Sequence, residues 1–195
     1  LGGVGVALPV INVALKERGS MMSYGIATLI ALFAAIGYVL YQLALDHVAP
    51  AAIFSQDVLV DDAFGSLFAI AMLIVAIFTT VGSFSYMKNK ANPSIYFSLI
   101  LLSAIGMVLV AYSTDLVMLF VAWELMSIPT YILVGFLKKD PISNEAAIKY
   151  FLFGALSSAI IIYGISFAYG VTGSTNIGEV IKGLMVLDAK GLHID

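Results

Sequence analysis

Long uninterrupted stretches of apolar residues dominate the sequence. Five of them contain more than twenty residues each: Tyr24–Leu45, Ala63–Met87, Ser94–Thr114, Leu116–Leu137 and Ala146–Val171. At about 1.5 Å rise per residue, a helix of that length crosses the roughly 30 Å hydrocarbon core of a bilayer. Backbone polar groups in lipid are satisfied only in helices or closed barrels, and these stretches are too long for barrel strands. The pattern therefore predicts transmembrane helices.

The two ends of the sequence carry shorter apolar segments. Residues 1–15 are apolar and are followed by the charged Lys16–Arg18. A signal peptide has its positive charge before the apolar stretch, so we interpret residues 1–15 as the end of a helix, and the sequence as a fragment of a longer protein. Residues 177–187 have a moderately amphipathic pattern, with Asn176 and Glu179 as a capping pair. We expect this short helix to lie at the membrane interface.

Residues that cap helix N-termini stand directly before the apolar stretches. A proline at the first helical position adds to one of these signals. The expected caps are Asp61 or Asp62, Asn92 before Pro93, the segment 113–115, and Ser143 with Glu145. We predict an all-α, polytopic transmembrane helix bundle in a single domain over residues 1–195, with helices of about 1–15, 24–45, 63–87, 94–114, 115–137 and 146–171.

Composition supports a membrane protein and excludes several classes of function. Hydrophobic residues make up 62% of the chain and charged residues only 11%, whereas soluble domains are about one-quarter charged. There is no cysteine, which excludes disulfides and thiolate-held iron–sulfur clusters in this chain. The two histidines, His47 and His193, lie outside the apolar stretches, so a haem held between membrane helices is not expected. No basic patch indicates nucleic acid, and we expect no cofactor or metal here.

Charged residues alternate between successive connections. One set of connections holds seven of the nine basic residues: Lys16, Arg18, Lys88, Lys90, Lys138, Lys139 and Lys149. The other set holds acidic residues: Asp46, Asp57, Asp61, Asp62, Asp115 and Glu179. The positive-inside rule places the basic connections in the cytoplasm. We therefore expect a multi-pass protein of the cell's inner (cytoplasmic) membrane with its N-terminal end outside.

Glu124 is the one acidic residue inside an apolar stretch. It stands nine residues after Asp115 and fourteen before Lys138, near the middle of the expected fifth helix. An ionisable group at that depth costs at least about 2.5 kcal/mol on insertion scales. Lipid burial favours the neutral acid and a nearby cation favours the carboxylate, so such a group can relay protons. The alternative is a structural, neutral glutamate hydrogen-bonded to another helix.

Polar residues accompany Glu124 on its helix. Ser127 and Tyr131 follow at i+3 and i+7, on the same side, and are candidates for a proton path. Pro129 cannot donate a hydrogen bond to the carbonyl of Leu125, so we expect a helix kink there and a polar acceptor for water or a neighbouring side chain.

Lys149 is the second candidate, about one turn inside the sixth helix. It either extends to the cytoplasmic interface, as lysines near helix ends do, or serves as an entry or relay position for protons. Ser157, Ser158 and Tyr163 either line a wet path or pack helices, with Gly154 and Ser158 as a small-residue pair. Packing is favoured for the hydroxyls of the third helix, Thr79, Thr80, Ser83 and Ser85.

The stretch from Asp115 to Gly173 resembles a known family. The segments WELMSIPTYIL and EAAIKYFLFGALSSAIIIYG are similar to the fifth and sixth helices of antiporter-like subunits of complex I, and DDAFGSLF also fits. The resemblance is to the subunit N branch, which includes subunit N of NADH–quinone oxidoreductase and of an archaeal deazaflavin-linked dehydrogenase. It implies the N-terminal part of an antiporter-like fold, in the first of two inverted repeats.

The resemblance also implies a function and partners. It makes Glu124 a key proton-pumping residue and matches Lys149 to a lysine of the family pattern. The glutamate's partner would be a lysine on a broken seventh helix, beyond residue 195. The implied function is proton translocation in the membrane arm of a respiratory dehydrogenase. Flavin, iron–sulfur clusters and quinone or an equivalent carrier would then reside in partner subunits, and lipid would surround the chain. The alternatives are a subunit of a multi-subunit sodium/proton antiporter or membrane-bound hydrogenase, and a non-catalytic membrane scaffold.

Overall fold

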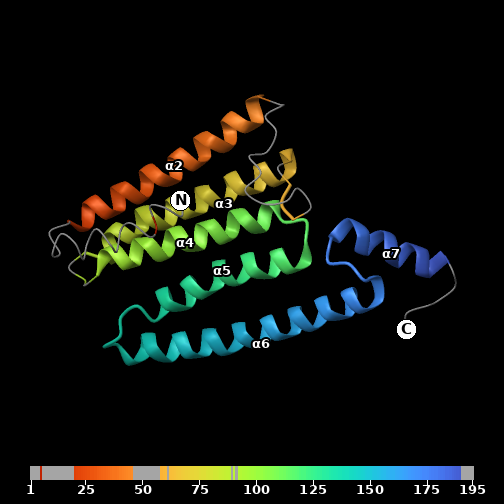
Figure 1. The fold of residues 1–195 in the computed structure, drawn as a ribbon. Coiled ribbons are helices and arrows are strands. Elements are labelled where there is room, and N and C mark those ends of the chain that lie inside the picture. The colour runs from red at the N-terminus through yellow and green to blue at the C-terminus, as the bar shows by residue number, and fades with distance from the viewer. Residues whose placement is uncertain are drawn as a thin grey trace.

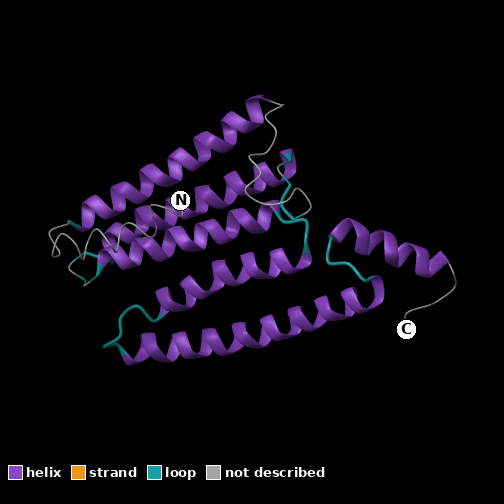
Figure 2. Cartoon of the chain, viewed as in Figure 1, coloured by secondary structure: helices purple, strands orange, loops and turns teal. Residues whose placement is uncertain are grey.

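The described part of the computed structural model is built from helices joined by short connections (Figures 1 and 2). The structure describes Gly5 and residues 20–45, 58–60, 62–88, 90 and 92–189. The helices are α2 Met21–Leu45, α3 Ala63–Tyr86, α4 Pro93–Tyr112, α5 Leu116–Val134, α6 Pro141–Thr172 and α7 Ile177–Ala189. The expected helix over residues 1–15 lies outside the described residues, except for Gly5, as do both histidines and Asp46, Asp57 and Asp61.

Five of the described helices, α2 to α6, are long and apolar enough to cross a membrane. The predicted all-α, polytopic transmembrane architecture is therefore confirmed. The 13 residues of α7 extend only about 20 Å, which is too short for a span.

The five long helices lie side by side, each roughly antiparallel to the next (Figure 1). α4 packs against α2, α3 and α5, and α6 packs against α5 and α7. The main apolar cluster joins α2, α3 and α4 through buried side chains such as Leu32, Leu73, Phe97 and Leu101. α6 instead exposes nearly all of its apolar side chains, which is compatible with lipid or further helices around it.

The N-terminal caps were predicted correctly at three helices. One is α7, where Asn176 accepts hydrogen bonds from the N–H groups of Gly178 and Glu179 at 3.0 and 3.2 Å. Asp62 accepts a hydrogen bond from the backbone N–H of Gly65 at 2.7 Å, at the start of α3. Asp115 accepts from the N–H groups of Val117 and Met118 at 2.9 and 3.0 Å, at the start of α5. These contacts satisfy donors that the first helical turn leaves without intrahelical partners.

Two other predicted caps are wrong. Asn92 has a left-handed backbone (φ 59°) and makes no capping hydrogen bond, although Pro93 does occupy the first turn of α4. α6 begins at Pro141, five residues before the start predicted at residue 146, because Asp140 followed by proline forms the cap. Ser143, expected to cap this helix, instead donates to the carbonyl of Val134 at 2.6 Å.

The connections at one end of the bundle are tied together by backbone hydrogen bonds. Thr114 donates to the carbonyl of Val58 at 3.0 Å, and its own carbonyl accepts from Ile177 at 2.9 Å. Isolated bridges pair Leu59 with Ser113 and Asp115 with Asn176. The segment between α4 and α5 therefore lies between the segments that precede α3 and α7, and the starts of α3, α5 and α7 are held at the same end.

Candidate functional site

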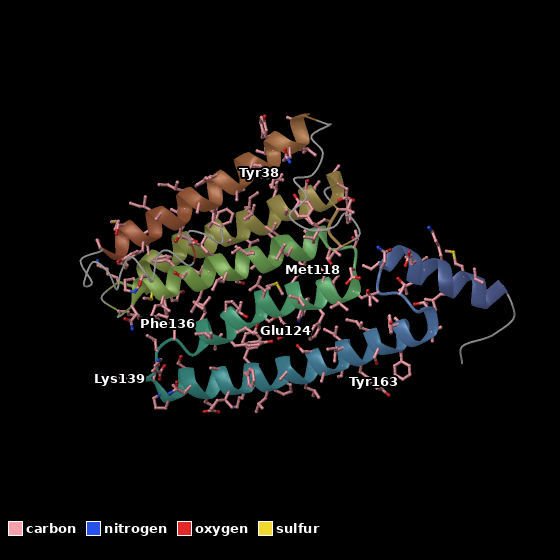
Figure 3. All side chains as sticks on the ribbon, viewed as in Figure 1. Tyr38, Met118, Glu124, Phe136, Lys139 and Tyr163 are labelled. Atoms are coloured by element: carbon pink, nitrogen blue, oxygen red, sulfur yellow. The ribbon has the colours of Figure 1, made fainter. Side chains whose placement is uncertain are left out.

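Glu124 lies in mid-helix and faces a neighbouring helix. It stands nine residues after the cap residue Asp115, about 13.5 Å along α5, and is half-buried. It is the one charged residue of this 19-residue helix. Figure 3 places it on the side of α5 that faces α6. Its position along α5 is therefore the mid-helix position expected from the sequence.

Ser158 of α6 is the hydrogen-bond partner of Glu124. Its Oγ donates to Oε1 of Glu124, across the interface between the two helices. Ser158 is the buried residue of α6, with 9% of its surface exposed. The sequence offered Ser158 only as one of several small or hydroxyl residues, and its pairing with the carboxyl group was not predicted.

Tyr131 and Gly154 make the next contact between α5 and α6, toward the end of the bundle that carries the lysines. The ring of Tyr131 packs edge-on against Tyr150 and Phe151, with centroids 4.8 and 5.9 Å away. Its hydroxyl lies over Gly154, so closely that a Cβ there would be 2.1 Å from the oxygen. Glycine at residue 154 therefore leaves the space that the phenol occupies, one helical turn from Ser158.

The hydroxyls next to Pro129 bond to the backbone of α5 itself. Ser127 is buried and donates to the carbonyl of Trp123 at 2.8 Å, and Thr130 donates to the carbonyl of Ser127 at 2.6 Å. α5 continues as one helix on both sides of Pro129. The hydroxyl of Ser127, a candidate for a proton path, is thus directed to its own helix and not to Glu124.

α4 supports α5 at the level of Glu124. A Cβ at Gly106 would be 2.4 Å from the backbone nitrogen of Met126 and 2.9 Å from the carbonyl oxygen of Ala122. Ser103 donates to the carbonyl of Met126 at 3.1 Å. The two backbones therefore touch on both sides of Glu124 in sequence, which fixes the height of its Cα relative to α4.

Lys149 is not brought next to Glu124. Its Nζ pairs with Oε1 of Glu145, one turn earlier on α6, and both side chains are 66% exposed. Residues of α6 that contact α5 or its C-terminal cap include Ser143, Ala147, Tyr150, Phe151, Gly154 and Ser158. At 100° per residue, Lys149 points to the opposite side of α6.

The remaining hydroxyl residues lie away from Glu124. Ser157 is exposed and donates to the carbonyl of Phe153 at 2.9 Å, and Tyr163 is exposed and packs on Phe167. On α3, Thr79, Thr80 and Ser83 each donate to a carbonyl four residues earlier. These bonds fit the packing interpretation that the sequence favoured for α3.

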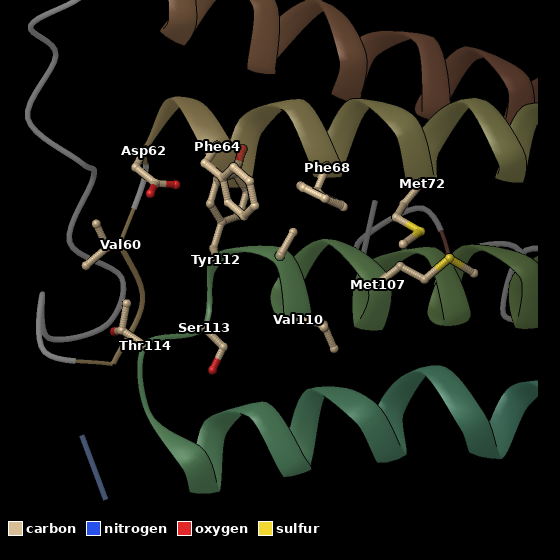
Figure 4. Close-up of a pocket in the computed structure, with 11 residues that line it drawn as sticks. Val60, Asp62, Phe64, Phe68, Met72, Met107, Val110, Tyr112, Ser113 and Thr114 are labelled. Carbon is tan, nitrogen blue, oxygen red and sulfur yellow. The ribbon is translucent and has the colours of Figure 1, made fainter. Parts of the chain in front are cut away.

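A pocket of about 380 Å³ lies between α3 and α4, at the end of the bundle where α3 begins (Figure 4). Phe64, Phe68, Met72 and Met107 give it a mostly apolar lining, with Asp62 at its edge. Glu124 does not line it. Within the described residues, no group of three or more histidine, aspartate or glutamate side chains is arranged to hold a metal.

Comparison with known proteins shows which family this chain resembles. Residues 113–193 match the family described as "NADH:quinone oxidoreductase/Mrp antiporter, TM". Over 185 residues the chain is 38% identical to NADH-quinone oxidoreductase subunit N of Desulfitobacterium hafniense, covering 94% of this chain and 35% of that protein. Over 125 residues it is 39% identical to F(420)H(2) dehydrogenase subunit N of Methanosarcina mazei, covering 64% and 25%. The chain thus spans a quarter to about a third of the length of these relatives.

Solved structures agree on the fold. The chain superposes on a chain of respiratory complex I from Thermus thermophilus with a TM-score of 0.70 and 26% identity, over 95% of this chain and 42% of that one. A chain of an archaeal membrane-bound sulfane sulfur reductase shares the fold at a TM-score of 0.68 and 23% identity, over 92% and 39% of the two chains.

The fold and the matched segment define the class of protein. Residues 113–193 match the NADH:quinone oxidoreductase/Mrp antiporter transmembrane family, and the chain is a multi-pass membrane protein with the fold of the antiporter-like subunits of complex I. Within that class its resemblance is to the subunit N branch, as its sequence predicted.

Proposed function

We propose that this chain is part of a proton-translocating membrane-arm subunit of a complex-I-like respiratory dehydrogenase, with Glu124 as its protonatable centre. The observation that carries the proposal is the position of this carboxyl group. It lies in mid-span, half-buried, on α5, and its partner is a neutral hydroxyl on α6. A carboxyl group is rarely retained at such depth without a function.

The proposed chemistry is a switch between two protonation states. A cation that approaches Glu124 favours the carboxylate, and its withdrawal favours the neutral acid. Alternation between these states moves a proton onto and off the carboxyl group. The resemblance to the family supplies the cation as a lysine on a further helix. Tyr131, between Glu124 and the lysine-bearing end, is the proposed path residue on that side, and Pro129 the proposed site of a kink.

The same proposal assigns roles to partners and to Lys149. The relatives are named as subunits of an NADH–quinone oxidoreductase and an F(420)H(2) dehydrogenase. We infer that this chain contributes no redox group, and that flavin, iron–sulfur clusters and quinone or an equivalent carrier belong to other subunits.

Lys149 is proposed as a second residue of proton translocation, which protons would reach from the lysine-bearing end. The proposed location is the inner membrane, with the N-terminal end outside.

The test replaces Glu124 by glutamine in the complete, assembled complex. Glutamine keeps the shape and can accept the hydrogen bond from Ser158, but it cannot ionise. We expect proton pumping in reconstituted vesicles, and the electron transfer coupled to it, to fall to a small fraction of the parental rates. Glu124→Asp retains the acid with a shorter reach and should lose less.

A matched control is available at Glu179, which accepts a hydrogen bond from Ser174 outside the five spans. Glu179→Gln removes a charge in the same way and should leave pumping at the parental level. If the assembled Glu124→Gln complex pumps at the parental proton-per-electron ratio, Glu124 is structural and the proposal fails.

A second function is supported by the family description itself, which includes the Mrp antiporters. In that case the chain would be part of a subunit of a multi-subunit sodium/proton antiporter or a membrane-bound hydrogenase. Purification separates these functions. Iron–sulfur and flavin subunits that copurify and oxidise NADH or a reduced deazaflavin identify the dehydrogenase. Sodium-driven proton movement in vesicles without those subunits identifies the antiporter.

A further inference from the structure

We propose that Ser158 is the positioning residue for Glu124: its hydroxyl holds the carboxyl group against α6 and remains its partner in both protonation states. The inference rests on the proposed function, because it specifies how that protonatable centre is held. The structural basis is the hydrogen bond from Ser158 Oγ to Glu124 Oε1.

The direction of this hydroxyl distinguishes Ser158 from its neighbours. Serines within helices usually donate to a carbonyl three or four residues earlier on their own helix. Ser157 and Ser166 of α6 do so, with Phe153 and Tyr163 as acceptors at 2.9 and 2.6 Å. Ser158 is buried and donates across the interface instead. Its hydroxyl is therefore available to the carboxyl group of Glu124.

Hydrogen-bond chemistry explains why a serine suits this position. A carboxylate only accepts hydrogen bonds, so it needs a donor, and a donor stabilises its charge. A protonated carboxyl group has an O–H to donate, and a serine oxygen accepts as well as donates. Rotation of one hydroxyl therefore keeps the pair bonded when Glu124 gains or loses a proton. Neither lysine nor alanine has this property.

Contacts with α4 already hold the backbone of α5 around Glu124, so only the direction of its side chain remains to be set. Gly106 and Ser103 of α4 hold the backbone of α5 on both sides of residue 124. Among the described residues, no lysine or arginine forms an ion pair with Glu124 within 4.0 Å. The direction of the carboxyl group in this state is consequently decided by the donor on α6.

Other titratable groups near α5 do not replace this contact. On the helices packed against α5 they are Tyr96 and Tyr112 of α4 and Glu145, Lys149, Tyr150, Tyr163 and Tyr169 of α6. On α5 itself, Tyr131 is directed to Gly154, one turn from Ser158. Glu145 and Lys149 pair with each other on the opposite side of α6.

The test compares Ser158→Ala, Ser158→Thr and Ser158→Cys in the complete complex, with Ser157→Ala as the matched control on the exposed side. The first measurement is the infrared C=O stretch of the protonated Glu124, identified by its absence in Glu124→Gln. The second is the pH dependence of proton pumping. Both report on the carboxyl group and not merely on helix packing.

We expect Ser158→Ala to raise the C=O stretching frequency, because a hydrogen bond to the carboxyl group is lost. It should also change the pH dependence of proton pumping, because the carboxyl group loses its hydrogen-bond partner. Ser158→Thr keeps the hydroxyl and should restore parental values, and Ser157→Ala should match the parent. Cysteine is a weaker hydrogen-bond donor, so the C=O frequency and pH profile of Ser158→Cys should lie between those of Ser158→Ala and the parent. This variant provides the test if Ser158→Ala does not assemble.

Two outcomes separate this inference from the proposed function. The role of Ser158 is overturned if Ser158→Ala has the parental C=O stretching frequency and the parental pH profile. If the alanine variant does not assemble, the same result in Ser158→Cys overturns it. Pumping can still be lost in Glu124→Gln in that case, and the function then stands. Parental pumping in Glu124→Gln overturns the function, and with it this role, even where the band shifts in Ser158→Ala.

Discussion

Hydroxyl groups determine how polar atoms are accommodated around Glu124. Ser158 donates to the carboxyl group, whereas Ser103 donates to the backbone carbonyl of Met126 on α5. Ser127 and Thr130 serve two more carbonyls of the same stretch. A polar group left unpaired in an apolar medium costs several kcal/mol, and these bonds give each of the four hydroxyls a partner.

Lys149 is the residue whose proposed role calls for the sharpest test. It stands nine residues after the cap residue Asp140, roughly 13 Å along α6, and pairs with Glu145 on the side facing away from α5. Lys149→Met keeps the aliphatic length and removes the charge, and we expect it to lower proton pumping severalfold in the assembled complex. Lys149→Arg keeps a cation and should lose less.

The control for Lys149 is its partner. Glu145→Gln breaks the same ion pair but leaves the lysine charged, so a proton relay through Lys149 should survive it. Exposed pairs of this kind contribute little to stability, so neither change is expected to impair assembly. Equal losses in Lys149→Met and Glu145→Gln would indicate that the pair, and not the lysine, is what matters. Parental pumping in Lys149→Met would make this residue an interfacial lysine.

Among the helices, α4 and α5 make the closest backbone contact on which the proposed centre depends. Small residues at membrane helix interfaces allow backbones to approach and gain dispersion contacts. Gly106 provides this space beside Met126, and Gly154 provides it beside Tyr131. α5 is therefore fitted between two helices, each of which presents a glycine and a serine to it.

Gly106→Ala tests this contact. The added Cβ meets backbone atoms of Met126 and Ala122, which cannot rotate away, so α4 and α5 must separate. We expect a loss of about 1–3 kcal/mol in the free energy of unfolding, typical of overpacking. The measurement is denaturant unfolding of the purified subunit in detergent, together with proton pumping of the complex, which should also fall because Glu124 moves relative to α6.

Gly82 supplies the control within another span. A Cβ there has no neighbour within 4 Å, so Gly82→Ala adds only helix propensity and should be neutral or slightly stabilising. Equal unfolding free energies for the alanine variants of Gly82 and Gly106 would contradict the close packing of α4 on α5.

Across the bundle, the lysines of two connections and three of the acidic residues lie at opposite ends. Lys88, Lys138 and Lys139 lie in the connections α3–α4 and α5–α6, and Asp62, Asp115 and Glu179 lie at the opposite end. Figure 3 shows Lys139 at the end far from α7. The backbone ties between residues 58–60, 112–116 and 175–177 brace the end that carries Asp62 and Asp115. The alternation read from the sequence is therefore an alternation between opposite ends of the described bundle.

The positive-inside rule turns this division into a prediction about sidedness. These 195 residues contain no cysteine, so single cysteines can be introduced at Lys88, Lys139 and Glu179 without removing any first. A membrane-impermeant maleimide added outside intact cells should label the variant at Glu179. It should reach those at Lys88 and Lys139 only after the membrane is opened. Labelling of the lysine positions in intact cells, with Glu179 protected, would reverse the orientation.

The spans, the mid-helix position of Glu124 and the resemblance to the subunit N branch could all be read from the sequence. Membrane insertion depends on the hydrophobicity of continuous segments, which is a local property, and so five spans were found from their composition alone. The caps Asp62 and Asp115 were equally local, because a short polar side chain bonds to its own first turn. The motif segments around Glu124 carried the resemblance to the subunit N branch, which the relatives confirm.

Which side chains meet depends on how the helices pack against one another. A serine in a helix can bond to its own backbone or to a neighbour, and only the packing of α6 on α5 made Ser158 the partner of Glu124 while Ser157 bonds to its own helix. The same packing turned Lys149 away from α5. A uniformly apolar helix gives no sequence signal for the side that faces its neighbour, because lipid and helix interiors are equally apolar. That choice depends on close approach at residues such as Gly106 and Gly154, which only the three-dimensional fit of the helices brings about.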